Sequence, residues 1–149
     1  MTKTSNQMAI LVAILAVSLP FGARSDTANY DNDPLFHDLG GRDGVDNIAK
    51  FTVAQFLADA RIKAIFDNTN MVRLQRLLSE QFCVVAGGPC LYTGRSMHAT
   101  HKALGLTNAN FNAVVEDLEA AMTQAGVPYR VQSRFLARLA PMHRDIVTK

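Results

Sequence analysis

The stretch GRSMHATHKALGLTNANF, from Gly94 to Phe111, places two of the four histidines of the chain three residues apart. Its pattern predicts a short helix over residues 96–104, with Gly105 as the C-terminal cap. His98 and His101 then lie on neighbouring parts of the helix surface, and only one of them points fully inward. The stretch therefore predicts a short helix that presents one histidine to the protein interior.

His101 shares the apolar face of this predicted helix with Met97 and Leu104, whereas His98 lies at the edge. A zinc site would need third and fourth ligands, and no nearby Cys, His, Asp or Glu group has the usual spacing. No local motif indicates a Ser-His-Asp or Cys-His nucleophile either. A buried histidine that faces an apolar cavity is typical of a single axial ligand to haem iron. The side chains expected to line such a cavity are Phe66, Leu74, Leu78 and Phe111.

Every segment after Pro34 has helical periodicity, and no period-two segment of any length is present. Glycine, proline and Asx turns separate the segments, and Pro141 should kink or interrupt the last one. The sequence predicts an all-α fold of six or seven unequal helices. The expected apolar stripes are Val45, Ile48, Ala49, Thr52, Val53, Phe56 and Leu57; Ile62, Ile65 and Phe66; Met71, Leu74, Leu77, Leu78, Phe82 and Val85; Phe111, Val114, Val115, Leu118 and Met122; and Val131, Phe135, Leu139, Met142 and Ile146.

The N-terminus has the pattern of a secretory signal peptide over residues 1–25. Lys3 precedes the apolar run Met8–Leu19, and the small-x-small pattern Ala23–Ser25 predicts cleavage before Asp26. The run is shorter than the ~20 residues that a membrane-spanning helix needs, so stable membrane insertion after cleavage is not expected. An uncleaved N-terminal anchor is the alternative. The expected location is the periplasm or the exterior of the cell.

Residues 26–34 read as a polar lead-in to a single domain over residues 35–149. The chain has 15 Lys and Arg and 13 Asp and Glu, but Lys3 and Arg24 belong to the expected signal. The mature chain is therefore close to neutral. Because it shows no basic stripe with interleaved aromatic residues, nucleic-acid binding is not indicated.

Cys83 and Cys90 are the only cysteines, and an exported pair this close in sequence favours a disulfide over two free thiols. The glycines and proline between them, Gly87 to Pro89, allow the chain to turn back. Covalent haem attachment is not indicated, since it needs a Cys-x-x-Cys-His motif.

Several short elements follow one another along the chain: Leu39-Gly40-Gly41, Phe66, Met71, Gly87-Gly88-Pro89, Tyr92-x-Gly94, Met97-x-x-x-His101 and Phe111. In their order and spacing these elements resemble the group I truncated haemoglobins, over about Leu35 to Val147. The resemblance implies a 2-on-2 helical sandwich around haem b, with His101 as the proximal ligand of the iron, and diatomic gases as ligands. It also implies that Phe66 packs on the haem and that Tyr92 and Arg95 lie near the haem edge or the propionates.

The distal side departs from the pattern of many group I members, which place tyrosine on the first long helix and glutamine or histidine on the distal helix. Here Val53 takes the tyrosine position, and leucines, including Leu74 and Leu78, take the distal-helix positions. A hydrogen-bond donor to bound O2 contributes about 1.5 to 3 kcal/mol, so weak O2 binding is expected. Gln81 and Gln55 are the nearest amides, Thr52 is placed off the haem face, and a five-coordinate ferrous iron is predicted. The residues assigned to the haem site are His101, Phe66, Met97, Tyr92, Arg95, Leu74, Leu78, Val53 and Phe111.

Three functions remain open at this point. The first is reversible binding of O2, NO or CO. The second is haem redox chemistry, such as NO oxidation or peroxide reduction, which would need an electron donor in the periplasm. The third is a helical module that has lost haem, with His101 as a core residue. The sequence does not indicate an oligomeric state.

Overall fold

The protein was analysed as a computed structural model that describes residues 34–149. The expected signal peptide and residues 26–33 of the lead-in lie outside the described residues. The described part is built from helices, and it contains no strand. The all-α prediction is therefore confirmed. The helices are α1 (Leu35–Asp38), α2 (Gly41–Ala58), α3 (Met71–Val85), α4 (Met97–His101), α5 (Asn108–Gln124), α6 (Tyr129–Leu139) and α7 (His143–Ile146), with 3-10 turns η2 (Lys63–Phe66) and η3 (Ala140–Met142).

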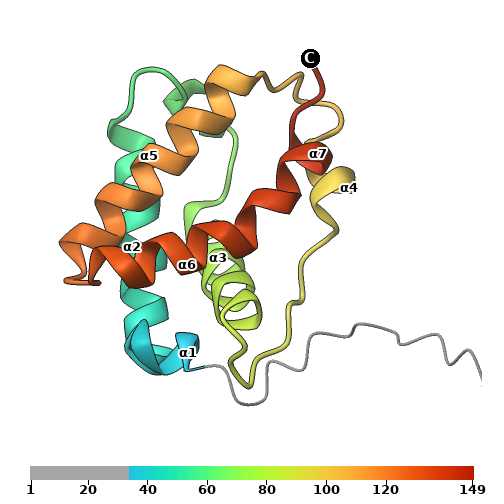
Figure 1. Cartoon of the computed structure of the whole chain (residues 1–149). Helices are drawn as coiled ribbons and strands as arrows, with labels where there is room; N and C mark the ends of the chain where they lie inside the picture. The colour runs from blue at the N-terminus through green and yellow to red at the C-terminus, as the bar shows by residue number, and fades with distance from the viewer. Residues whose placement is uncertain (1–33) are drawn as a thin grey trace, which may run out of the picture.

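The four long helices α2, α3, α5 and α6 form the body of the molecule (Figure 1). Helix α2 packs along α5 and against α3, and α6 contacts both α3 and α5. The short helix α4 follows a long extended segment and packs against α7 near the C-terminus. No helix within residues 34–149 has the length and apolarity to cross a membrane.

Side-chain caps begin three of these helices. The Asn70 side chain accepts a hydrogen bond from the backbone of Arg73 at 2.9 Å and caps α3. Thr107 and Asn110 form a reciprocal capping box at the start of α5, as the sequence predicts for Thr107. Ser96 caps α4 in the same way. The sequence therefore determines these three helix starts locally.

Helix α4 ends three residues before the predicted end, and this corrects the sequence analysis. Lys102 is the C-cap of α4, and Gly105, with a φ of 62°, lies in the following turn. Leu104 is 50% exposed, so it does not share an apolar face with His101. The turn instead leads to Leu106, which is buried and whose carbonyl accepts bonds from the C-terminal residues Thr148 and Lys149.

Two apolar clusters form the core. The larger cluster joins α1, α2, α3, α5 and α6 around Phe82 and Phe135, whose rings meet edge to face at 5.4 Å. The smaller cluster centres on Phe56, Ile62 and Ala113. Leu78 is half-buried and packs against both clusters. The middle of α3 therefore lies where the two clusters meet.

The burial of the apolar stripes agrees only in part with the prediction from the sequence. Helix α2 buries its stripe except for Leu57, which lies in the last turn of the helix and is 47% exposed, so the prediction for this residue is wrong. Of the α3 stripe only Phe82 is fully buried, whereas Leu74 and Leu78 are half-buried. Pro141 does interrupt the last helix, because α6 ends at Leu139 and η3 separates it from α7.

The predicted disulfide between Cys83 and Cys90 is present, with a Cα–Cα distance of 5.9 Å. Cys83 is fully buried on α3, and Cys90 begins the extended segment that leads to α4. Gly88 has no room for a side chain, because a Cβ there would lie 2.6 Å from the Cys83 sulfur and 2.5 Å from the ring of Phe36. The glycine pair therefore lets the chain turn back tightly over the disulfide.

Candidate haem site

His101 ends α4 with one ring nitrogen already engaged. Its Nδ1 lies 2.8 Å from the carbonyl oxygen of Met97, one turn earlier on the same helix. A carbonyl oxygen only accepts, so Nδ1 carries the proton and Nε2 carries the lone pair. Ligating histidines are commonly oriented in this way by a backbone carbonyl. His101 is half-buried, whereas His98 is exposed, as the sequence predicts for the pair.

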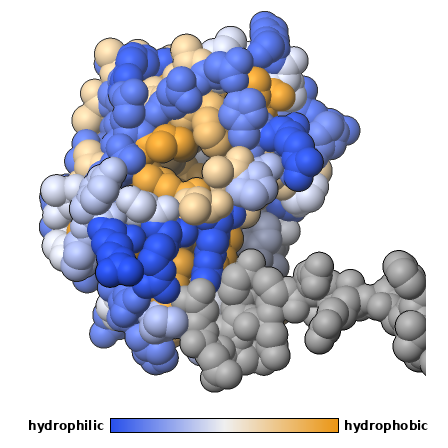
Figure 2. Space-filling model, viewed as in Figure 1, coloured by the Kyte–Doolittle hydropathy of each residue, from blue (hydrophilic) through white to orange (hydrophobic). Residues whose placement is uncertain are grey.

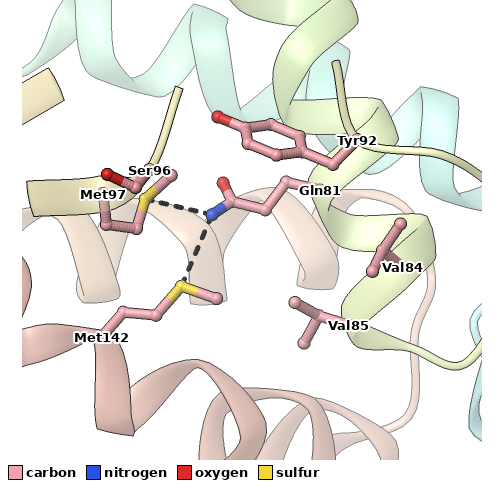
Figure 3. A pocket seen from close by; sticks show the side chains of 7 residues that line it. All are labelled: Gln81, Val84, Val85, Tyr92, Ser96, Met97 and Met142. Atoms are coloured by element: carbon pink, nitrogen blue, oxygen red, sulfur yellow. Dashed lines mark hydrogen bonds between the residues drawn. The ribbon is translucent and has the colours of Figure 1, made fainter. Parts of the chain in front are cut away.

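A cavity of about 190 Å³ lies beside α4, between the C-terminal half of α3 and η3. Met97 and Met142 point toward the amide of Gln81 from opposite elements (Figure 3). Gln81 Nε2 donates to the Met97 sulfur at 3.1 Å and to the Met142 sulfur at 3.4 Å. The lining is Gln81, Val84, Val85, Tyr92, Ser96, Met97 and Met142.

The space-filling view shows hydrophobic residues gathered around a hollow on the face seen in Figure 1 (Figure 2). Phe66 stacks on Phe56 at a ring distance of 5.2 Å, and both pack with Leu78 in the smaller cluster. Leu74 is half-buried one turn earlier on α3, and Val53 is buried on α2. The structure therefore brings Phe66 and Leu78 together in one apolar cluster. Leu74 lies on the same helix as Leu78, and Val53 lies on α2.

Polar groups on α2 are engaged elsewhere. The Thr52 hydroxyl is buried and donates to the carbonyl of Ile48 at 2.8 Å. Gln55 donates to Gln124 at 3.4 Å, on an exposed part of α5. Neither group is therefore available as a donor toward a ligand on the inner face of α2.

Tyr92 and Arg95 precede α4 and differ in environment. The Tyr92 hydroxyl donates to the backbone carbonyl of Arg95 at 3.1 Å, and its ring lines the cavity. Burial raises the pKa of Tyr92 above its ordinary value, and the nearby carboxylate of Glu80 adds to this shift. The Arg95 side chain is exposed, so its charge faces solvent next to the start of α4.

Phe111 lies near the N-terminus of α5 and contacts α7. Its half-buried ring meets the His143 ring edge to face at 4.8 Å. Asn108 contacts His143 Nε2 at 2.7 Å through its side-chain oxygen. These contacts join α5 to α7, the helix on which α4 packs. Phe111 therefore supports the environment of α4 through α7.

Sequence reasoning missed several residues of this region. Met142 was assigned only to an apolar stripe, and Ser96 and the Val84–Val85 pair were not assigned to a site. Glu80 was not assigned to a site either, and its side chain is only 12% exposed. No local pattern could have found these residues, because they meet across elements that are far apart in sequence.

The residues present fit haem. His101 Nε2 provides one nitrogen lone pair on a short helix, which is what an axial ligand requires. Half-buried apolar side chains on α3, η2 and α4 offer the surface that a planar apolar group would cover. Arg95 supplies an exposed cation suited to a carboxylate, such as a propionate. In this arrangement His101 would hold the iron, and Phe66, Leu74, Leu78 and Met97 would contact the ring system.

Comparisons with known proteins match most of the described residues. The bacterial-like globin family model matches residues 34–148. The chain is 36% identical to the group 1 truncated haemoglobin of Synechocystis, over 77% of this chain and 98% of that protein. The truncated haemoglobin from Tetrahymena pyriformis, in its Fe(III) form, superposes with a TM-score of 0.74 at 28% identity, covering 77% of this chain and 98% of that chain. The 2/2 haemoglobin from Synechococcus gives a TM-score of 0.71 at 26% identity, with the same coverage.

These matches confirm the predicted 2-on-2 globin fold, the haem cofactor and the binding of diatomic gas ligands. They cover nearly all of the described residues, including α4 and its histidine. The chain belongs to the bacterial-like globin family and is a group 1 truncated haemoglobin.

Proposed function

We propose that this protein binds diatomic gases outside the cytoplasm, at a haem iron held by His101 and flanked by an apolar distal side. The observation that carries the assignment of the ligand is the bond between His101 Nδ1 and the Met97 carbonyl, because it leaves Nε2 free to donate its lone pair. None of the other three histidines fits as well, since His37 and His98 are exposed and His143 Nε2 contacts Asn108.

When bound, haem would supply an iron that His101 would hold and that would bind the gas. The protein determines what surrounds that gas. Val53, Leu74 and Leu78 present hydrocarbon, which excludes water and offers no hydrogen bond to a partly negative O2. Thr52 and Gln55 already have partners on α2 and α5. This arrangement supports weak binding and fast dissociation of O2. The binding of CO and NO should be affected less.

Among the residues that line the cavity beside α4, Gln81 carries a side-chain amide. It is half-buried and its two acceptors are thioether sulfurs, which accept hydrogen bonds only weakly. In this arrangement the amide points toward the sulfurs of Met97 and Met142, and it does not donate to a gas ligand. A second, enzymatic function is not proposed, because the polar side chains of Gln81 and Tyr92, which line the described cavity, already donate to other groups of the protein.

The proposed location rests on the sequence of residues 1–25, with its short apolar run and small-x-small pattern. The Cys83–Cys90 disulfide supports it, because disulfides persist in oxidising compartments. Mass measurement of the protein recovered from the cell exterior or periplasm tests both points. A mature N-terminus at Asp26 is the expected result, and retention of residues 1–25 in a membrane fraction would contradict it.

The ligand assignment is tested by replacing His101 with glycine in the haem-reconstituted protein. We expect the ferrous and CO-bound spectra to lose their histidine-ligated form and to regain it when imidazole is added. His98→Gly is the matched control, because it changes an exposed histidine on the same helix. An unchanged spectrum for His101→Gly, or a shift of the same size for His98→Gly, would refute the assignment.

A further inference from the structure

A charged cluster fastens the segment before α4 to the middle of α3. Glu80 Oε2 accepts two hydrogen bonds from Thr93, one from the backbone N–H at 2.9 Å and one from the hydroxyl at 2.7 Å. Arg76 pairs with the other carboxylate oxygen of Glu80 and also donates to the Thr93 hydroxyl at 2.9 Å. Three residues therefore close one clasp, which we call the Glu80–Thr93 clasp.

The Glu80–Thr93 clasp holds the backbone of Thr93 in addition to pairing the charges of Arg76 and Glu80. An exposed ion pair contributes little, but the Glu80 side chain is only 12% exposed and accepts a backbone N–H. Charge-assisted bonds of this kind are shorter and about twice as strong as neutral ones. The same bonds from Thr93 hold the pKa of Glu80 below its ordinary value, so the carboxylate stays charged at neutral pH.

The position of α4 depends on this segment. Helix α4 has five residues and is too short to be stable without tertiary support. Its cap, Ser96, follows Thr93 by three residues, and Tyr92 stiffens the intervening turn through its bond to the Arg95 carbonyl. The disulfide at Cys90 holds the other end of the segment to α3. Helix α4 also packs against α7, near the C-terminus.

We propose that Glu80 is a positioning residue for the proximal ligand. Through Thr93 it sets the place of α4 relative to α3, and so the place of His101 relative to the distal helix. The inference rests on the proposed function, in which His101 binds the iron. By this inference the Glu80 carboxylate, which lies outside the apolar pocket, controls how strongly and in what orientation the imidazole binds the iron.

The test compares Glu80→Gln, Thr93→Val and Thr93→Ser in the ferrous holoprotein. Glu80→Gln removes the charge at constant size, Thr93→Val removes the hydroxyl, and Thr93→Ser keeps both donors. We expect Glu80→Gln and Thr93→Val to shift or broaden the iron–histidine stretching band and to accelerate haem loss to an acceptor globin, about tenfold for Glu80→Gln. Thr93→Ser should behave as the wild type. Glu116→Gln is the control, because it alters an exposed ion pair with Arg61, which shares no residue with the clasp.

Hydrogen exchange of the haem-free protein gives a second readout. In Glu80→Gln we expect faster exchange over residues 92–101 and unchanged exchange in α2 and α5. If the wild type shows the iron–histidine band and Glu80→Gln leaves the band, haem loss and exchange unchanged, the inference is overturned while the proposed function stands. If the wild type has no such band, or His101→Gly does not remove it, the proposed function fails and the inference fails with it.

Discussion

The ring of His101 is oriented by the backbone of its own helix, since Nδ1 meets the carbonyl oxygen of Met97 at 2.8 Å. The side chain of the same Met97 accepts from Gln81 on α3 at 3.1 Å. Met97 thus contacts the histidine through its backbone and the distal helix through its side chain. One residue links the orientation of the proximal imidazole to the helix on the other side of the site.

A new donor on α3 should increase O2 affinity. Leu78 is half-buried at the junction of the two core clusters, and Leu78→Gln would introduce an amide next to Phe66. A hydrogen bond to the partly negative O2 is worth about 1.5 to 3 kcal/mol, so we expect O2 dissociation to slow about tenfold to a hundredfold, with a smaller change for CO. Flash photolysis measures both rates. Val72→Gln, at a position 82% exposed on the same helix, should change neither; equal effects of the two variants would contradict an apolar distal side near Leu78.

Loss of the disulfide should destabilise the fold. Cys83 and Cys90 are seven residues apart, and closing a loop of this size contributes about 2 to 3 kcal/mol in the chain-entropy model. We expect the Cys83→Ala/Cys90→Ala double variant to lower the free energy of unfolding in urea by about this amount. A reducing agent should lower the stability of the wild type similarly and leave the double variant unchanged. A further loss in the reduced double variant would show that the agent acts elsewhere.

Asp117 should oppose folding at neutral pH. It is 8% exposed on α5, and its Oδ2 has no hydrogen-bond partner within the described residues. Burial, with a smaller contribution from Asp59, raises its pKa above the ordinary value of 3.8. The folded state therefore binds the proton more tightly than the unfolded state, so stability falls as pH rises through the folded pKa. Asp117→Asn should raise the free energy of unfolding by about 1 kcal/mol at pH 7.

The gain from Asp117→Asn should disappear below pH 3.8, where the carboxyl is protonated in both states. Denaturant unfolding at several pH values measures this trend. Glu119→Gln, an exposed carboxylate on the same helix, serves as the control and should have little effect at any pH. A constant gain across the pH range would indicate a packing effect instead of a titration.

The Glu80–Thr93 clasp should loosen in acid. The pKa of Glu80 is lowered from the ordinary value of 4.5 by its bonds from Thr93 and, less strongly, by Arg76. A depressed pKa contributes stability above the unfolded value that is lost as pH falls through the folded value. The neighbouring Tyr92, whose pKa is raised by burial, stays neutral in this range. Haem loss from the wild type should therefore accelerate below pH 4.5 and approach the rate of Glu80→Gln. Parallel pH profiles for the two proteins would contradict this prediction.

Much of this protein follows from the sequence by itself. Helical periodicity predicted the long helices, because a helix that buries one face places apolar residues three and four positions apart in the sequence. Thr107 and Asn110 start α5, and Pro141 interrupts the last helix, because caps and prolines act within a few residues. The spacing of Met97 and His101 likewise predicted which histidine is oriented inward, since a helical turn joins them directly.

Other features were decided only by the tertiary structure. Leu57 and Leu104 have the right spacing for a buried stripe, yet each is about half exposed because no other element covers it. Glu80 has the spacing of an outer charge on α3, yet the segment that returns from the disulfide folds over it and brings Thr93 to its carboxylate. Local sequence determines where a helix starts and which face is apolar. Which neighbours cover that face depends on contacts between residues far apart in the chain, and these form only when the whole domain folds.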